Sequence, residues 1–230
     1  VAMHLWPDLK VGQIGTKVGP IMAASDPVTI EVIGRGAHAS LPNRAIDPIV
    51  IGSQIINNIQ TIVSRNVDPF EQAVVTFGIF HGGTRYNTIP EKINLEGTVR
   101  TFNEEVRQKV YHRIFEIAEK TAEGMGGEAK VDYIKSYPST VNDENMVNIA
   151  KNSIKDILGS GNYINIERPA SGGEDFAYFT KEVPSVYLWL GYGKEDEEVY
   201  PPHSPHYDFD EKALGYGVKA FCKLALNWGK

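Results

Sequence analysis

The sequence predicts an α/β protein in which one compact unit is inserted into a second, incomplete α/β domain. Two observations lead to this prediction. Residues 25–136 contain segments with strand and helix periodicity in the order β-α-β-β-α-β. The segments on either side, residues 1–24 and 137–230, also alternate between strand-like and helix-like patterns, which is typical of an α/β domain.

The inserted unit is predicted to contain four strands and two helices. β-Branched or alternating apolar residues indicate strands at residues 28–33, 73–80, 93–101 and 129–134. Apolar residues at helical spacing indicate helices over residues 46–63 and 103–123, which start at Asp47-Pro48 and at the N-cap Asn103. This order corresponds to the ferredoxin-like split βαβ fold, with both helices on one sheet face. The other face is left for solvent, a partner or a substrate.

The flanking segments predict a sheet with few strands. Residues 1–23 hold two short apolar segments. The later segment is predicted to form a helix, a strand, a short helix, a buried strand and a final helix, at residues 143–158, 163–166, 174–180, 185–190 and 210–228. Because so few strands make a thin sheet, we expect half of this α/β domain to lie outside these 230 residues.

Composition excludes several classes of function. A formal net charge of -6 provides no basic surface for nucleic acid or for an anionic membrane. The single cysteine, Cys222, excludes an internal disulfide and is consistent with a reducing compartment, so a cytoplasmic location is expected. No run of eighteen apolar residues is present, and therefore no membrane span is expected.

Two of the six histidines are candidate metal ligands. His203 is flanked by three prolines within residues 200–210, and prolines restrict the loop that carries it. His4 lies in the segment Met3–Pro7, where a hydrogen-bonded core histidine is the more common alternative. No pair of histidines has the i, i+4 spacing of a helical zinc motif, so a metal site would need ligands from distant segments.

Candidate substrate-binding residues lie in three places. Arg100 is on the polar side of its predicted strand, where it would bind a carboxylate or pair with Glu96. Asn87 is either a turn former or a donor to the same ligand. Residues 171–175 have the composition of a helix start with a serine cap and an acidic first turn, and their glycines would also let a ligand approach the backbone.

Several motifs in one order along the chain resemble a known family. They are Gly36–Pro42, Ile46–Pro48, Asn87–Pro90, Gly97–Thr101, Gly173–Phe176 and His203–Pro205. Together they resemble the aminoacylase/carboxypeptidase family of di-metal amidohydrolases, in the branch of hippurate hydrolases, N-acyl-amino-acid amidohydrolases and indole-acetyl-amino-acid hydrolases. The resemblance implies a zinc-peptidase-like α/β catalytic domain with an inserted ferredoxin-like lid that dimerises.

The resemblance also implies a reaction and the residues that catalyse it. The family hydrolyses the amide bond of N-acyl amino acids or short peptides with two divalent metal ions, zinc or else manganese or cobalt, and a glutamate base. By motif, His4 and His203 would be metal ligands. His38, on the lid, would reach the site of the partner subunit and support the developing oxyanion.

The substrate-binding roles follow from the same resemblance. Asn87 and Arg100 would together hold the α-carboxylate of the substrate. Gly172 and Gly173 would let the backbone approach the acyl part.

The sequence departs from the family at its beginning. The family carries a His-x-Cys-Gly-His-Asp motif and a Glu-Glu pair before the position of His4, and neither occurs there. Three of five expected ligands and the general base are therefore missing. We expect this chain to be a truncated, inactive part of an amidohydrolase with an incomplete metal centre.

Two alternatives remain from the residues themselves. The inserted unit would also suit a non-catalytic dimeric module that binds an amino-acid-like carboxylate through His38, Asn87 and Arg100. A protein–protein scaffold is the other alternative. The helix predicted at residues 46–63 has more apolar surface than one sheet face needs, which favours a dimer formed by this helix and an edge strand.

Overall fold

The computed structural model describes residues 1–193 and 199–228, and the chain divides into two compact units. The terminal unit is formed by Val1–Met22, Thr140–Ala170 and Glu174–Lys230, and the inserted unit by Ala23–Ser139 and Ser171–Gly173. A short glycine-containing segment late in the chain thus belongs to the inserted unit. Among the described residues, no helix is both long and apolar enough to cross a membrane.

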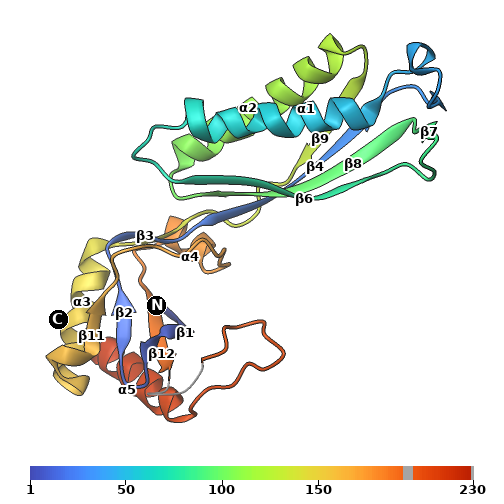
Figure 1. The fold of residues 1–230 in the computed structure, drawn as a ribbon. Helices are drawn as coiled ribbons and strands as arrows, with labels where there is room; N and C mark the ends of the chain where they lie inside the picture. Colours follow the sequence, from blue (N-terminus) through green and yellow to red (C-terminus); the bar gives the residue numbers. More distant parts are fainter. Residues whose placement is uncertain (194–198, 229–230) are drawn as a thin grey trace. The chain divides into compact units, whose positions relative to one another are not determined.

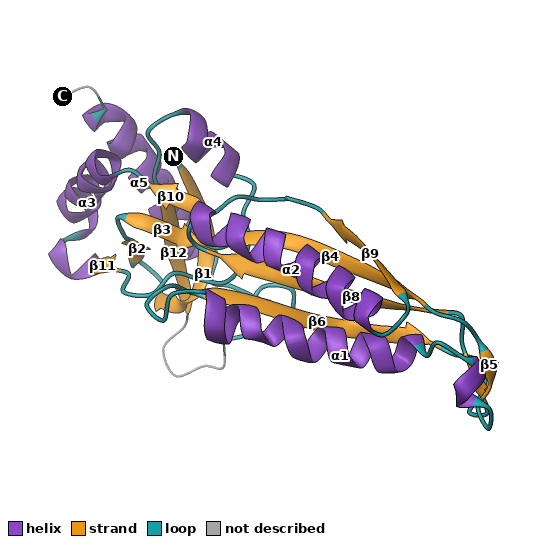
Figure 2. Cartoon of the chain, turned by 90° about the horizontal axis from the view of Figure 1, so that it is seen from above, coloured by secondary structure: helices purple, strands orange, loops and turns teal. Residues whose placement is uncertain are grey.

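The inserted unit is built on a four-stranded antiparallel sheet. Its strand order is β6 (Ala73–Gly82), β8 (Lys92–Thr101), β4 (Ala24–Ile33) and β9 (Glu128–Tyr133). Helices α1 (Pro48–Thr61) and α2 (Glu104–Gly124) cover one face (Figure 1). Seen from above, the helices lie side by side along the strands (Figure 2). The four strands of this sheet and its two helices follow one another in the order predicted from periodicity.

Alternation along β4 shows which sheet face meets the helices. Val28, Ile30 and Val32 are buried, whereas Pro27 and Thr29, which alternate with them, are exposed. The buried row packs with apolar residues of both helices, among them Ile51, Ile55, Val110 and Ile114. Each buried aliphatic side chain stabilises the fold by about 1.5–3 kcal/mol. Residues at odd positions of β4, and their partners on β8, therefore lie on the face that carries no helix.

Short polar interactions fix where the two helices begin. The carboxylate of Asp47 accepts a hydrogen bond from the backbone N–H of Ile49 (2.9 Å), and the side chain of Asn103 accepts one from Glu105 (2.8 Å). Both bonds satisfy backbone donors of a first helical turn. The prediction of Asn103 as an N-cap is confirmed.

The long connection between β6 and β8 is more ordered than a plain loop. Residues Thr88–Ile89 form strand β7, which pairs antiparallel with β5 (Ala37–His38). Along β6 the register shifts between Phe77 and Ile79, which marks a β-bulge in this edge strand. The sequence predicted neither feature, because both depend on pairing between distant segments.

The terminal unit contains a mixed sheet. Its order is β1 (Ala2–Lys10), β12 (Tyr187–Gly193), β2 (Ile14–Thr16) and β11 (Tyr163–Asn165), with β1 parallel to β12. A second pair joins β3 (Gly19–Met22) to β10 (Thr140–Asn142). Helices α3 (Glu144–Leu158) and α5 (Lys212–Asn227) share one apolar core with Leu188 and Leu190 of β12. On the opposite side, Trp189 stacks on Trp6 with ring centroids 3.8 Å apart.

One local prediction is wrong. The helix expected at residues 174–180 is α4 (Ala177–Glu182), and its N-cap is Phe176, with no side-chain cap. Ser171 therefore does not cap a helix. Instead, the carboxylate of Glu174 accepts a hydrogen bond from the hydroxyl of Tyr187. The pKa of Tyr187 is raised, mainly because its hydroxyl is buried and also because it donates to the carboxylate of Glu174.

A buried ion pair holds the base of the inserted unit together. Asp26, whose side chain is 1% exposed, accepts hydrogen bonds from Nε (2.8 Å) and Nη2 (2.5 Å) of Arg107. The hydroxyl of Tyr133 and the backbone N–H of Ser136 also donate to it, each at 2.9 Å. All four acceptor positions of the carboxylate are used, so the charge is compensated within the protein.

We expect Asp26→Asn to destabilise the inserted unit by about 3–5 kcal/mol, because it removes the buried charge that pairs with the guanidinium of Arg107 and leaves only the longer ion pair with Glu104 (3.4 Å). Urea unfolding followed by far-UV circular dichroism measures this change, since the inserted unit contains no tryptophan. Glu123→Gln is the control. It breaks an exposed pair with Lys120 and should leave the stability close to that of the wild type. Equal effects of both variants would contradict this assignment.

Candidate functional site

Arg100 lies on the helix-free face of the inserted sheet. Its Nη1 donates to the hydroxyl of Ser25, its direct partner on β4, and to the carbonyl of Val99 (3.3 Å). The guanidinium forms no ion pair within the described residues, and the alternative pairing with Glu96 is not observed. Desolvation lowers the pKa of Arg100, and the nearby charge of Asp26 opposes this shift. A partly buried cation without an anionic partner can bind a carboxylate.

The predicted glycines lie beside the same residues. The carbonyl of Gly172 accepts a hydrogen bond from the backbone N–H of Ala23 (3.0 Å). At Gly173, an added Cβ would lie 2.5 Å from the Cβ of Ser25, closer than side-chain atoms approach. Only glycine fits there without a shift of the neighbouring chain. The inserted unit thus brings Arg100, Gly172 and Gly173 together around the start of β4.

His38 and Asn87 come together at the opposite end of the inserted sheet. His38 pairs with Thr88 in the small β5–β7 sheet, and the backbone N–H of Ala39 donates to the carbonyl of Asn87 (3.0 Å). Figure 1 shows β7 at the end of the sheet away from the start of β4. The pairing from Arg100 to Lys92 spans eight residue steps, which is about 27 Å at 3.4 Å per residue. Within one chain, Asn87 and Arg100 therefore do not contact the same carboxylate.

The hydrogen bonds of His38 define which ring nitrogen carries the proton. The backbone N–H of Ser40 donates to Nδ1 of His38 at 3.2 Å, and the hydroxyl of Ser40 lies 2.7 Å away from the same atom. A backbone N–H is only a donor, so Nδ1 must be an acceptor. In the neutral ring, Nε2 then carries the hydrogen and can donate it to an oxyanion.

His4 has the opposite arrangement. Its Nδ1 lies 2.7 Å from the carbonyl oxygen of Leu5, which is only an acceptor, so Nδ1 carries the hydrogen. The neutral ring then keeps its lone pair on Nε2, the form that binds a metal. The side chain is exposed on β1, at the position paired with Trp189.

His203 lies in a tight turn of the terminal unit. The backbone N–H of Ser204 donates to the carbonyl of Pro201 (3.2 Å), which places Pro202 and His203 at the two central positions. His203 has φ of 70° and is the only non-glycine residue of the described chain with a positive φ. This conformation costs a non-glycine residue about 1–2 kcal/mol. Residues held this way cluster at functional sites, so the turn supports a functional role for the imidazole.

No complete metal-binding cluster is found in the part of the chain that the structure describes. Within it, no group of three or more histidine, cysteine, aspartate or glutamate side chains is placed to hold one ion. His4 and His203 are thus not part of any such three-donor group among the described residues. Cys222 is exposed on α5 and does not join such a cluster.

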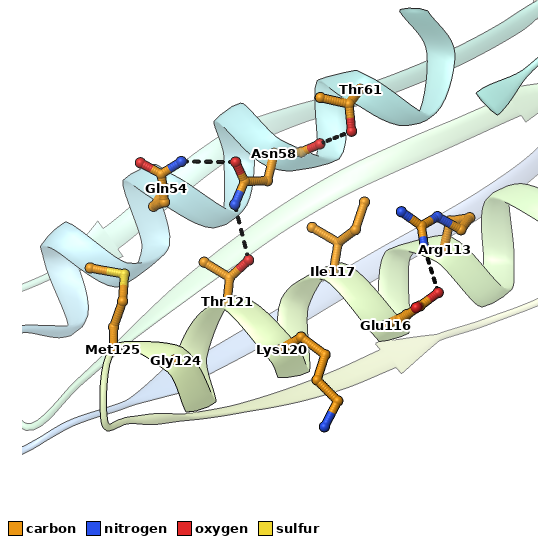
Figure 3. Close-up of a pocket in the computed structure, with 10 residues that line it drawn as sticks. All are labelled: Gln54, Asn58, Thr61, Arg113, Glu116, Ile117, Lys120, Thr121, Gly124 and Met125. Carbon is orange, nitrogen blue, oxygen red and sulfur yellow. Dashed lines mark hydrogen bonds and ion pairs between the residues drawn. The ribbon is translucent and has the colours of Figure 1, made fainter. Parts of the chain in front are cut away.

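A groove between α1 and α2 has a volume of about 600 Å³, but it holds none of the predicted site residues. Figure 3 shows that its polar side chains bond to one another. Asn58 donates to Thr121 (3.1 Å) and accepts from Gln54 (2.8 Å), and Arg113 pairs with Glu116. Because these groups are already satisfied, the groove is a weaker candidate than the surroundings of Arg100.

Ser25 was missed by the sequence reasoning. Its place beside Arg100 and Gly173 depends on the register of β4 against β8 and on a segment almost 150 residues later in the chain. A serine at the start of a strand carries no local signal for such a role. The alternating pattern of β8, which placed Arg100 on the open face, was the only indirect indication.

Comparison with known proteins identifies the family. The profile described as Peptidase family M20/M25/M40 matches residues 1–227. N-acetylcysteine deacetylase of Bacillus subtilis is 38% identical over 225 residues, which cover 97% of this chain and 57% of that protein. IAA-amino acid hydrolase ILR1-like 4 of Arabidopsis thaliana is 32% identical over 231 residues, which cover 98% of this chain and 52% of that protein.

A solved structure agrees with these relatives. The Bacillus subtilis YXEP protein, described as a dinuclear metal binding peptidase from the M20 family, superposes with a TM-score of 0.77 and 34% identity, covering 97% of this chain and 55% of that one. The chain belongs to peptidase family M20/M25/M40. Relatives of the chain include enzymes named as a deacetylase and an amino acid hydrolase, which agrees with the amidohydrolase branch that the motifs predicted. It spans little more than half the length of these relatives.

We expect His203→Gly to be more stable than His203→Ala by about 1 kcal/mol, because glycine adopts a positive φ without the clash of a Cβ. Both variants remove the imidazole, so they form a matched pair. Urea unfolding followed by tryptophan fluorescence reports on the terminal unit, which contains Trp6, Trp189 and Trp228. Equal stability of the two variants would show that the turn does not require a left-handed residue.

Proposed function

We propose that this chain is part of a metal-dependent hydrolase that cleaves the amide bond of N-acyl amino acids, and that Arg100 binds the carboxylate of the amino acid. The observation that carries the proposal is the partly buried guanidinium of Arg100, which lacks an anionic partner within the described chain. Two relatives named as a deacetylase of N-acetylcysteine and a hydrolase of IAA-amino acids support this class of substrate.

His4 and His203 are proposed as the contribution of this chain to a centre of two divalent metals. Imidazole ligands suit zinc, manganese or cobalt, and the Nε2 lone pair of His4 is left free for one of them. When bound, such metals would polarise the amide carbonyl and lower the pKa of a water molecule. Because no three-donor group occurs within the described residues, we propose that the remaining ligands and the glutamate base lie outside those residues.

The backbone glycines are proposed to bind the acyl side of the substrate. Gly172 and Gly173 lie beside Ser25 and Arg100, so a ligand held by its carboxylate would pass this segment. Glycines leave the main chain open to close contact.

The inserted unit is proposed to be a ferredoxin-like lid that also forms a homodimer. Strand β6 is an edge of its sheet, and Val74, Ile79 and Phe80 of this strand are exposed. Ile49 and Val50 of α1 are exposed as well. An edge strand and a helix that both expose apolar side chains are suited to pairing with a second copy.

Dimerisation would explain why the predicted substrate-binding residues lie at two ends of the lid. Asn87 and His38 lie at the end of the sheet near Lys92, which is about 27 Å along the strand from Arg100, so they serve no common ligand with Arg100 within one chain. We propose that both residues reach the site of the partner subunit. There, the Nε2 hydrogen of His38 would donate to the oxyanion that develops on the amide carbonyl.

A second candidate function is a non-catalytic, dimeric module that binds an amino-acid-like carboxylate. The absence of a three-donor cluster from the described residues favours this function for the chain on its own. The carboxylate site at Arg100 is common to both candidates. Turnover and metal binding separate them.

We expect the chain to bind Zn²⁺ weakly and His4→Ala or His203→Ala to weaken this binding by about tenfold or more, because each variant removes one ligand. Isothermal titration calorimetry measures the affinity. His112→Ala is the matched control, since His112 is an exposed histidine on α2 that packs against Tyr111. Unchanged affinity in both site variants would remove the metal assignment and leave the binding module.

We expect no hydrolysis of N-acetyl amino acids by this chain with added Zn²⁺ or Mn²⁺, because no three-donor group for a metal ion occurs within the described residues and we propose that the general base lies outside them. Release of free amino acid, followed by derivatisation of the new amine, is the measurement. Turnover that disappears in His203→Ala would contradict the proposed inactivity of the chain and would establish the hydrolase class directly.

A further inference from the structure

Arg100 is oriented by a neutral group rather than by a counter-ion. Its Nη1 donates to the hydroxyl of Ser25, and the nearest carboxylate on β4, that of Asp26, is fully occupied by Arg107, Tyr133 and Ser136. A carboxylate partner would neutralise the guanidinium, whereas a hydroxyl restrains it and leaves its charge for a ligand. An arginine restrained before binding loses less conformational entropy when the ligand arrives.

Ser25 itself contacts three neighbouring residues, Tyr137, Arg100 and Gly173. Its backbone N–H donates to the carbonyl of Tyr137 (2.9 Å), with which it forms an antiparallel bridge. On its other side it pairs with Arg100 in the β4–β8 ladder. Its Cβ faces Gly173, where any side chain would come within 2.5 Å. Backbone contacts therefore fix the main chain of Ser25, and the position of the hydroxyl that meets Arg100 depends on the absence of a side chain at residue 173.

We propose that Ser25 is a positioning residue that presets the guanidinium of Arg100 for the carboxylate of the substrate, and that Gly173 maintains this arrangement by leaving room for Ser25. This inference rests on the proposed function of Arg100. It assigns to Gly173 a second role besides the proposed approach of the backbone to the acyl group.

The test uses the whole chain, labelled with ¹⁵N, and follows the Nε–Hε resonance of Arg100, assigned by its loss in Arg100→Lys. N-acetyl-L-alanine is the probe, and N-acetyl-L-alaninamide, which lacks the carboxylate, is its control. The wild-type chain should bind the carboxylate and not the amide. Ser25→Ala should weaken the carboxylate affinity about tenfold, as expected for the loss of one hydrogen bond to a charged group, and Ser25→Thr should retain it.

Two further variants separate positioning from a general effect on the sheet. Gly173→Ala should weaken carboxylate binding about as much as Ser25→Ala, although it removes no polar group, because it displaces Ser25. Thr98→Ala removes a hydroxyl from the same face of β8, two residues from Arg100, and should leave the affinity unchanged. Without ligand, Ser25→Ala and Gly173→Ala should lower the order parameter of the Arg100 Nε–Hε bond, whereas Thr98→Ala should not.

The outcomes distinguish the two proposals. If the wild-type chain does not discriminate the carboxylate from the amide, or if Arg100→Ala binds as tightly as wild type, the proposed function of Arg100 fails and the role of Ser25 fails with it. If binding depends on Arg100 while Ser25→Ala matches the wild type in affinity and in the Nε–Hε order parameter, only the positioning role of Ser25 is overturned. Should Ser25→Ala not fold, Ser25→Cys and Gly173→Ala provide the same comparison.

Discussion

The ten-residue antiparallel pairing of β4 with β8 is the constraint on which the candidate site depends. It places Ser25 opposite Arg100 at one end and Ile33 opposite Lys92 at the other. Because side chains alternate between faces, the register that buries Asp26 under α2 also presents Ser25 on the open face. A slip of one residue would exchange these two side chains and would separate the carboxylate of Asp26 from the buried guanidinium of Arg107. Stability and the candidate binding site are thus set by adjacent residues of one strand.

The two predicted functional histidines with defined ring contacts have opposite tautomers, and each matches its proposed role. His38 accepts at Nδ1 from a backbone N–H, which leaves a donor at Nε2. His4 donates from Nδ1 to a backbone carbonyl, which leaves a lone pair at Nε2. In both cases a main-chain group within two residues selects the tautomer. Local backbone geometry therefore determines which histidine suits an oxyanion and which suits a metal ion.

The sequence was sufficient for features that depend on nearest neighbours. Apolar periodicity located the four main strands and the two long helices of the inserted unit, and Asn103 was identified as a cap by its residue type and position. The family followed from short motifs. Features that depend on pairing between distant segments could not be predicted from the sequence. The motifs placed Asn87 and Arg100 on one ligand, whereas the length of the paired strands separates them within one chain. Ser171 resembled a helix cap, but its neighbours Gly172 and Gly173 join the inserted unit instead.

The bulge in β6 limits how this protein can associate with copies of itself. Gly78 is the extra residue between Phe77 and Ile79, and an edge strand interrupted at that point offers only short regular stretches for hydrogen bonding to another strand. A long, flat edge would template the addition of copy after copy into a fibril. The interruption opposes such repeated addition, so this edge strand can expose apolar residues without nucleating aggregation.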